Sequence, residues 1–329
     1  MRRILVLHTG GTLMMKPGDG GVLHTDAYGR DLVAELPILG RVADVSTRVL
    51  FDLDSGDMQP AHWIEIARAV HAALTSFDGI VVIHGTDTMA YAASAVAMLL
   101  GSLPKPVIFT GAQRPLTEAR TDARANLVDA VFAATLPIPE VSIVFASRVL
   151  RGVRSIKQDA RGLVAFDTPR CGPLAELGVD VDIAGHVRPG GALADFDERI
   201  EPRVLAVRVF PGLDPALVRG AIRTGVRGLV LEAYGTGNLP NLSGSLIPAL
   251  EEARARGVPV VVVSQCPRGA VDMRRYAGGA AAAAAGAISG GEMTVEAAIA
   301  KTMIGLARYD SPTELRYWLE RDVVGERGA

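Results

Sequence analysis

Short apolar runs alternate with segments of helical periodicity along most of this 329-residue chain, and no other feature constrains its fold as much. Residues 79–84 and 106–110 are apolar without the every-second-residue pattern of a half-exposed strand. Strands of this kind lie at the centre of a parallel sheet with helices on both faces. Residues 60–74 begin with proline and carry apolar side chains at helical spacing. The alternation therefore predicts an α/β fold built on a doubly wound parallel sheet.

The alternation is interrupted by one stretch that is rich in proline, glycine and charged residues. Residues 188–203 lose both the strand and the helix periodicity, which is typical of an exposed connection between domains. We therefore predict a larger N-terminal catalytic α/β domain over residues 1–187, a linker over residues 188–203, and a smaller α/β domain over residues 204–329. A chain of 329 residues commonly forms more than one domain, which agrees with this division.

Composition and charge argue against several classes of protein. Hydrophobic residues make up 49% of the chain and the net charge is −2, which fits a globular protein and neither a disordered chain nor a basic nucleic-acid-binding surface. No segment reaches the roughly 18 apolar residues of a membrane span, and residues 4–7 are too few for the core of a signal peptide. Cys171 and Cys266 lack metal-ligand spacing. We therefore expect a cytoplasmic protein without a metal, nucleic-acid partner or membrane partner.

Small and polar residues follow three of the predicted strands, where the active sites of parallel sheets gather. These are TGGT at 9–12, HGTDT at 84–88 and TGAQ at 110–113. The glycine pair before Thr12 would expose a hydroxyl nucleophile and leave N–H groups free to stabilise an oxyanion. A tight structural turn explains TGGT equally well. A phosphate-binding loop does not, because neither the three spaced glycines of the dinucleotide fingerprint nor the Gly-Lys-Ser/Thr of a P-loop is present.

Thr86 and Asp87 place a hydroxyl and a carboxylate side by side at the second of these strand ends. Lys157 is one of very few lysines, and if it were buried near them it could take part in proton transfer. Each residue also has a structural interpretation. Asp87 or Thr88 could cap the following helix, His84 could be a buried structural histidine, and Lys157 could be a solvated surface residue. Spacing alone leaves these alternatives open.

Taken together, the motifs resemble the bacterial L-asparaginase family, and more closely its cytoplasmic, type I branch. This resemblance implies a two-domain asparaginase-like fold without a cofactor. It also implies hydrolysis of L-asparagine to L-aspartate and ammonia, weaker activity on glutamine, and a homodimer or homotetramer. The motifs that carry it span nearly the whole chain: HTGGTL at 8–13, DSGDM at 54–58, HGTDTMAYAASA at 84–95, TGAQRPLTEARTDARANL at 110–127, RGVRSIKQDARGLVAFDTP at 151–169, EAYGTGNLP at 232–240 and SGGEMTVEAAIAKTMIG at 289–305.

The resemblance also implies a role for each matching residue. Thr12 would be the nucleophile that forms an acyl-enzyme with the substrate. Thr86, Asp87 and Lys157 would form a second catalytic group that handles proton transfer or the hydrolytic water. The substrate would be bound by residues on several loops: Ser55 and Gly56 at the α-carboxylate, Asp57 and Asp87 at the α-ammonium group, Ala112 at the amide, Thr86 as a further contact, and Asn238 from a neighbouring subunit.

Some positions depart from the family pattern. The tyrosine expected on the loop after the nucleophile falls on Val22, and Tyr28, a few residues later, is the candidate replacement for its hydroxyl. Gly56 stands where serine or glutamine is common, which removes one contact to the carboxylate. Glu232 and Ile156 stand where a regulatory asparagine site would need Arg and Thr, so we do not predict that site. The departures leave two alternatives: an amidohydrolase that prefers glutamine or another amide, or a binding module that has lost turnover.

Overall fold

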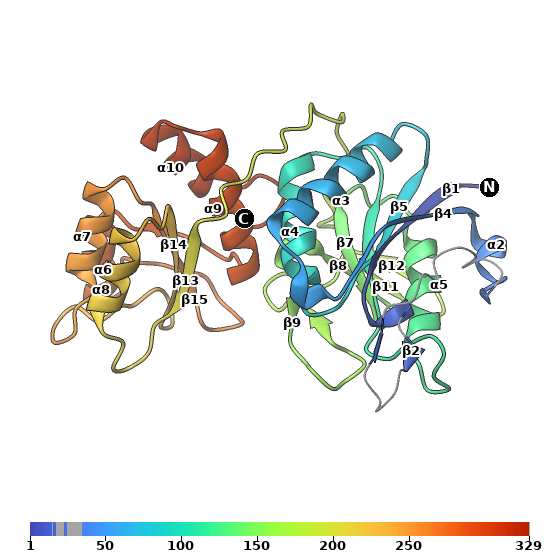
Figure 1. Cartoon of the computed structure of the whole chain (residues 1–329), viewed down its shortest axis with the longest axis horizontal. Helices are drawn as coiled ribbons and strands as arrows, with labels where there is room; N and C mark the ends of the chain where they lie inside the picture. Colours follow the sequence, from blue (N-terminus) through green and yellow to red (C-terminus); the bar gives the residue numbers. More distant parts are fainter. Residues whose placement is uncertain (15, 18–22, 25–34, 329) are drawn as a thin grey trace. The chain divides into compact units, whose positions relative to one another are not determined.

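The computed structural model describes every residue except 15, 18–22, 25–34 and 329. The chain forms two compact units, Met1–Glu198 and Arg199–Ala329 (Figure 1). The division between them lies inside residues 188–203, the stretch in which the sequence loses its periodicity. Each unit has a sheet and a hydrophobic core of its own.

The first unit is built on an eight-stranded sheet with the order β12-β11-β8-β7-β6-β5-β1-β4. Five neighbouring strands, from β4 to β7, are parallel, as the sequence predicts. The other three are antiparallel to their neighbours, so the sheet is mixed and not purely parallel. A tight turn with positive φ at Ala146 and Ser147 joins β7 to β8 and leaves no space for a crossover helix. The strands are β1 (Arg3–Gly10), β4 (Asp44–Leu53), β5 (Gly79–Ile83), β6 (Val107–Thr110), β7 (Val141–Phe145), β8 (Arg148–Arg151), β11 (Ala175–Leu177) and β12 (Val181–Ile183).

Helices cover both faces of this sheet. Figure 1 shows α3 (Pro60–Ala73) and α4 (Met89–Leu100) on one face, and α2 (Leu39–Val42) and α5 (Ala123–Ala133) on the other. Strand β5 is buried along its whole length, which explains why its sequence is apolar without alternation. Short pieces complete the unit: β2 (Lys16–Pro17), β3 (Leu23–His24), β9 (Ile156–Lys157), β10 (Phe166–Asp167), and the 3-10 turns η1 (Thr12–Met14), η3 (Ser55–Asp57) and η4 (Gly152–Arg154).

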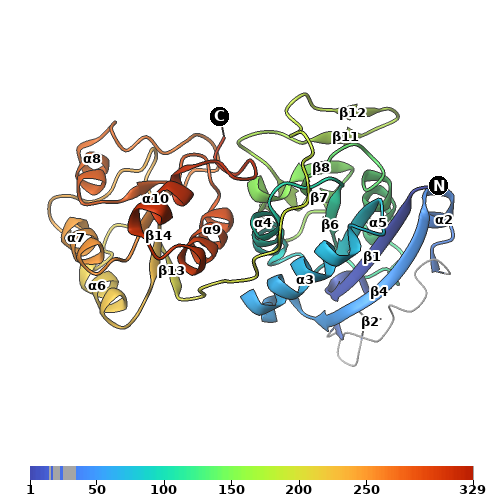
Figure 2. The ribbon, with the colours of Figure 1, turned by 90° about the horizontal axis from the view of Figure 1, so that it is seen from above.

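The second unit has a four-stranded parallel sheet with the order β13-β14-β15-β16. Figure 2 shows α6, α7 and α8 on one face of this sheet and α9 on the other. The alanine-rich stretch forms α8, which packs in the core through Ala282. The elements are β13 (Val204–Arg208), α6 (Pro215–Arg223), β14 (Gly228–Ala233), α7 (Ile247–Ala255), β15 (Val260–Ser264), α8 (Ala277–Ala284), β16 (Ile288–Ser289), α9 (Val295–Arg308) and α10 (Pro312–Glu320).

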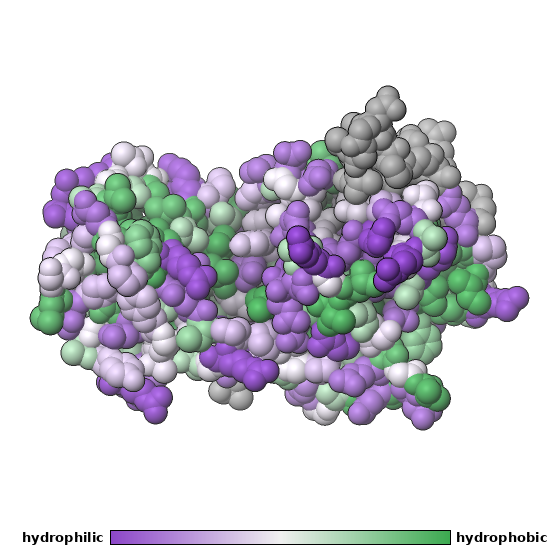
Figure 3. Space-filling model, turned by 90° about the horizontal axis from the view of Figure 1, so that it is seen from below, coloured by the Kyte–Doolittle hydropathy of each residue, from purple (hydrophilic) through white to green (hydrophobic). Residues whose placement is uncertain are grey.

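Polar and apolar residues are interspersed on the molecular face drawn in Figure 3. Among the described residues, which exclude 15, 18–22, 25–34 and 329, no helix has the length and hydropathy needed to cross a membrane. Cys171 and Cys266 are not in a disulfide.

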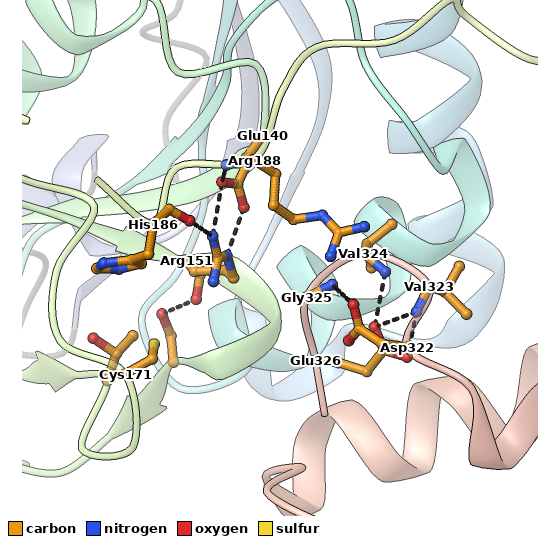
Figure 4. Close-up of polar contacts among 12 residues, drawn as sticks. Glu140, Arg151, Cys171, His186, Arg188, Asp322, Val323, Val324, Gly325 and Glu326 are labelled. Atoms are coloured by element: carbon orange, nitrogen blue, oxygen red, sulfur yellow. Dashed lines mark hydrogen bonds and ion pairs between the residues drawn. The ribbon is translucent and has the colours of Figure 1, made fainter. Parts of the chain in front are cut away.

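A buried ion pair holds the C-terminal segment of the second unit. Lys301 of α9 and Glu326 form this pair, and both side chains are 0% exposed. Lys301 also donates to the backbone oxygen of Arg321, while Glu326 accepts from the backbone N–H groups of Val323 and Val324 (Figure 4). Burial lowers the pKa of Lys301, and the attraction of Glu326 opposes that shift. The pair is stabilising only while both charges are present.

Replacing Lys301 with methionine would leave the carboxylate of Glu326 buried without its cation. We expect the free energy of unfolding of this unit to fall by about 3–5 kcal/mol. Urea unfolding of a Trp63→Phe variant, in which the fluorescence comes from Trp318 alone, would measure the loss. The double variant Lys301→Met/Glu326→Gln should lose less than Lys301→Met. An unchanged unfolding midpoint in Lys301→Met would contradict the importance of the pair.

Candidate active site

The carboxyl ends of three neighbouring strands are level with one another in the first unit. The strand register pairs His8 of β1 with Ile83 of β5, and Ile83 with Thr110 of β6. The segments that follow these strands therefore emerge at one edge of the sheet. They carry Thr12, Thr86 and Gln113.

Two glycines allow the backbones of these segments to touch. Gly11 has a φ of +92°, and a Cβ atom on it would lie 2.4 Å from the backbone nitrogen of Gly85. A Cβ atom on Gly85 would in turn lie 2.6 Å from the Cβ and Oγ atoms of Ser55. Any side chain at either position would force the loops apart. Thr12, Ser55 and Thr86 are thus brought together because their neighbours have no side chain.

Thr12 begins the short 3-10 turn η1 directly after this contact. The backbone of the turn is held from two sides. Gly11 N–H donates to Leu53 O at 3.1 Å, and Leu13 O accepts from Leu116 N–H at 3.0 Å. Leu13 itself is fully buried, whereas Thr12 is partly exposed. The turn therefore holds its backbone in the core and leaves the hydroxyl-bearing residue accessible.

The structure brings Lys157 into contact with Thr86 and Asp87. The Lys157 ammonium donates to Thr86 Oγ1 at 2.8 Å and to Asp87 Oδ1 at 2.6 Å. The Lys157 side chain is 19% exposed, so it is not the solvated surface lysine that the sequence left as an alternative. Asp87 is 69% exposed and can reach a ligand from solvent. A hydroxyl, a carboxylate and an ammonium group thus meet beside Thr12's turn.

The structure does not support the alternative in which the side chain of Asp87 or Thr88 caps α4. Thr88 is the N-cap residue of α4, but its side chain makes no capping hydrogen bond. Its hydroxyl donates to the backbone oxygen of Ser55 at 2.9 Å, and Asp87 N–H donates to Ser55 Oγ at 3.3 Å. The segment after β5 therefore holds the loop that contains Ser55, and the Asp87 carboxylate binds Lys157.

Ser55 lies in the 3-10 turn η3 and is 4% exposed. Asp54 caps this turn, because its side chain accepts from Gly56 N–H at 2.7 Å. Gly56 and Asp57 are exposed next to it. The loop therefore presents one buried hydroxyl and one accessible carboxylate close to the Lys157 cluster.

A buried ion pair holds the strand end that leads to Lys157. Arg151, the last residue of β8, donates to both carboxylate oxygens of Glu140 at 2.6 and 2.9 Å, and to the backbone oxygen of His186 at 2.8 Å (Figure 4). The Arg151 backbone oxygen accepts from Ser155 Oγ at 2.9 Å. These bonds fix η4 and therefore the start of β9, which ends at Lys157. The bidentate geometry makes the pair more directional than a lysine–carboxylate contact.

His8 lies within β1, two residues before its end, and His84 directly follows β5; both side chains are buried. Burial lowers the pKa of each imidazole from 6.5 to about 4, so both are neutral near pH 7. His84 Nδ1–H donates to Gly85 O at 2.7 Å. With pKa values this low, neither histidine is a strong base for a threonine nucleophile. This supports the structural interpretation of His84.

Gln113 is a polar neighbour of the cluster that the sequence analysis did not single out as a site residue. Thr86 Oγ1 donates to Gln113 Oε1 at 3.2 Å. Its place after β6, level with the other two strand ends, is the signal that could have identified it. Ala112, its neighbour, is 1% exposed.

The remaining predicted positions lie in the second unit or outside the described residues. Asn238 belongs to the second unit, where its backbone pairs with Tyr234 in both directions. Val22 and Tyr28 lie outside the described residues. Among the residues that the structure describes, no three histidine, cysteine or acidic side chains lie together in a way that could hold a metal ion.

Comparison with known proteins gives matches along most of the chain. The asparaginase N-terminal family matches residues 3–188, and the glutaminase/asparaginase C-terminal domain family matches residues 203–319. The chain belongs to the asparaginase family. This confirms the resemblance and the two-domain asparaginase fold that the sequence motifs predicted.

Individual asparaginases resemble the chain over its whole length. It is 37% identical to L-asparaginase 1 of Escherichia coli strain K12, with 99% of this chain and 98% of the relative covered. The structure of the thermostable L-asparaginase from Thermococcus kodakarensis superposes with a TM-score of 0.92 at 35% identity, covering 99% of both chains. That of L-asparaginase I from Vibrio cholerae has a TM-score of 0.90 at 35% identity and covers 100% of this chain and 99% of its own.

The two buried histidines make stability depend on pH. As the pH falls below about 6.5 the unfolded chain takes up a proton on each imidazole, whereas the folded chain does so only near pH 4. The free energy of unfolding should therefore fall between pH 6.5 and 4, by up to about 1.4 kcal/mol per pH unit for each histidine. Urea unfolding at several pH values would measure this slope. His8→Leu should make it shallower, and His186→Leu, at an exposed side chain, should not; equal slopes in the two variants would contradict the assignment.

Proposed function

We propose that this chain is an L-asparagine amidohydrolase that converts L-asparagine and water to L-aspartate and ammonia. The observation that carries the proposal is the contact of Lys157 with Thr86 and Asp87 at the sheet edge where Thr12 emerges. L-asparaginase 1 of Escherichia coli, 37% identical over nearly its whole length, supports the choice of substrate. No step of the reaction calls for a cofactor.

In the first half of the reaction, Thr12 Oγ attacks the carbon of the side-chain amide. The new C–O bond forms as the C–N bond breaks, and the hydroxyl proton goes to the leaving nitrogen, which departs as ammonia. In the second half, a water oxygen bonds to the acyl carbon and the ester bond to Thr12 breaks. One water proton returns to Thr12 Oγ, and aspartate is released.

Thr86, Asp87 and Lys157 assist these proton transfers. Asp87 orients the ammonium group of Lys157, and Lys157 in turn orients the Thr86 hydroxyl by a direct hydrogen bond. A hydroxyl held in this way can relay a proton or position the hydrolytic water. Because Asp87 is largely exposed, its second oxygen can also receive the α-ammonium group of the substrate.

The substrate's α-carboxylate is assigned to the loop that contains Ser55. Ser55 Oγ accepts from Asp87 N–H, and its own proton has no acceptor among the residues described, so it can donate to a carboxylate. Gly56 contributes no side chain there, and Asp57 is exposed for the α-ammonium group. Ala112 would line the amide end. Asn238 would come from another subunit of a cytoplasmic homodimer or homotetramer.

Thr12→Ala tests the nucleophile. Removing the attacking oxygen should lower kcat for ammonia release from asparagine roughly 10³-fold or more, because no acyl-enzyme can form. Thr75→Ala is a matched control, since Thr75 is exposed at the end of α3 and its hydroxyl bonds only to the helix backbone. Unchanged turnover in Thr12→Ala would remove Thr12 from the mechanism. Absence of turnover in the unmodified protein would favour the binding-module alternative.

A glutamine preference is the second candidate, because Gly56 has no side chain beside Ser55, and among the described residues a Cβ atom there would meet only the Asp54 carboxylate. We expect asparagine to be preferred, by about 10-fold or more in kcat/KM, since one extra methylene shifts the amide relative to Thr12. Ammonia release from the two amino acids over a range of concentrations would give the ratio. A ratio that favours glutamine would overturn the substrate assignment.

A further inference from the structure

Gln113 links the catalytic hydroxyl of Thr86 to the loop that follows Lys157. Its side-chain oxygen accepts from Thr86 Oγ1 at 3.2 Å. Its side-chain nitrogen donates to the backbone oxygens of Asp159 and Gly162 at 3.4 and 3.3 Å. One amide group therefore bridges two of the segments that build the site.

The partners of the amide determine which way it faces. The two backbone oxygens can only accept, so the NH₂ group must face them and the oxygen must face Thr86. The Lys157 ammonium has three protons and no acceptor, so Thr86 Oγ1 must accept from it. The single hydroxyl proton of Thr86 is then left for Gln113 Oε1. The resting direction of that proton is thus fixed by Gln113.

We propose that Gln113 is a positioning residue of the amidohydrolase: its amide oxygen holds the Thr86 hydroxyl proton away from Lys157 and so keeps the Thr86 oxygen turned towards the ammonium group. The inference rests on the proposed function, in which Thr86 and Lys157 move protons. The proposal adds Gln113 to this group of residues. Its role is to set the direction of the hydrogen bond that the Thr86 hydroxyl donates.

The backbone of Gln113 is rigid enough for this role. The carboxylate of Asp122, which is 8% exposed, accepts from Gln113 N–H at 2.9 Å and from Arg114 N–H at 3.0 Å. Asn126 donates to the same carboxylate at 3.1 Å and to Gly111 O at 3.0 Å. The segment after β6 is therefore tied to the first turns of α5.

The other end of the bridge is fixed as well. The Asp159 carboxylate accepts from the backbone N–H groups of Gly162 and Arg161 at 2.8 and 2.7 Å, and these bonds lower the pKa of Asp159. The carbonyl groups that receive the Gln113 amide thus belong to a closed turn. A side chain held at both ends loses little freedom when it orients Thr86.

The effect of removing this bridge should appear in kcat rather than in KM. Gln113 contacts Thr86 and the 159–162 turn, and the groups assigned to the substrate carboxylate lie on the Ser55 loop. Without Gln113 Oε1, the Thr86 hydroxyl proton loses the acceptor that fixes its direction. The hydroxyl could then rotate among several directions, and fewer molecules would be arranged for reaction.

Three variants test the proposal with the ammonia-release assay. Gln113→Met keeps the length of the side chain and removes all its hydrogen bonds; we expect kcat to fall roughly 10- to 100-fold with KM within about twofold of the unmodified protein. Gln113→Glu keeps an acceptor for Thr86, so its kcat should lie between that of Gln113→Met and that of the unmodified protein. Gln158→Met is the matched control, because Gln158 is exposed next to Lys157 and should keep full activity.

The outcomes separate this proposal from the proposed function. An unaltered kcat in Gln113→Met, or a Gln113→Glu variant no better than Gln113→Met, would overturn the role of Gln113. If Gln113→Met has the same thermal unfolding midpoint as Gln158→Met, a lower kcat in Gln113→Met is not caused by loss of folded protein. Thr86→Val removes the hydroxyl itself: full activity there would refute the catalytic role of Thr86, whereas an impaired Thr86→Val with an unaltered Gln113→Met would refute only the role of Gln113.

Discussion

The candidate site depends on the close approach of three loop backbones at one edge of the first sheet. Gly11, Gly85 and Ser55 are stacked so closely that a single added carbon at either glycine would collide with the next segment. The side chains of the candidate site are therefore positioned by glycines that have no side chain of their own, and the parallel strands behind supply the rigidity.

The antiparallel end of the sheet supplies the remaining group. A parallel crossover after β7 would place the next segment on a face of the sheet, whereas the tight turn at Ala146 and Ser147 keeps β8 within it. The buried pair of Glu140 and Arg151 then fixes the end of β8, so that the chain delivers Lys157 to Thr86 and Asp87. A buried ion pair between residues 11 positions apart thus helps to place a contact between residues 70 or more positions apart.

The polar contacts of the site also explain why structural and catalytic interpretations of the same residues are hard to separate from sequence. The Thr88 hydroxyl and the Asp87 backbone N–H both donate to Ser55 and hold its loop, while the Asp87 side chain binds Lys157. His84 is fully structural, although it stands next to the same glycine. Neighbours in the chain therefore have different tasks, because a loop turns successive side chains in different directions.

The sequence by itself determined the two α/β units, the run of parallel strands and the residues that follow them, because these depend on local periodicity and on glycine at turns. Its motifs also pointed to the asparaginase family, which the matches over residues 3–188 and 203–319 confirm. Only the tertiary structure decided that Lys157 contacts Thr86, that Thr88 does not cap its helix, and that Gln113 joins the cluster. Those contacts link residues 27 to 71 positions apart, and local patterns carry no information about which distant side chains meet.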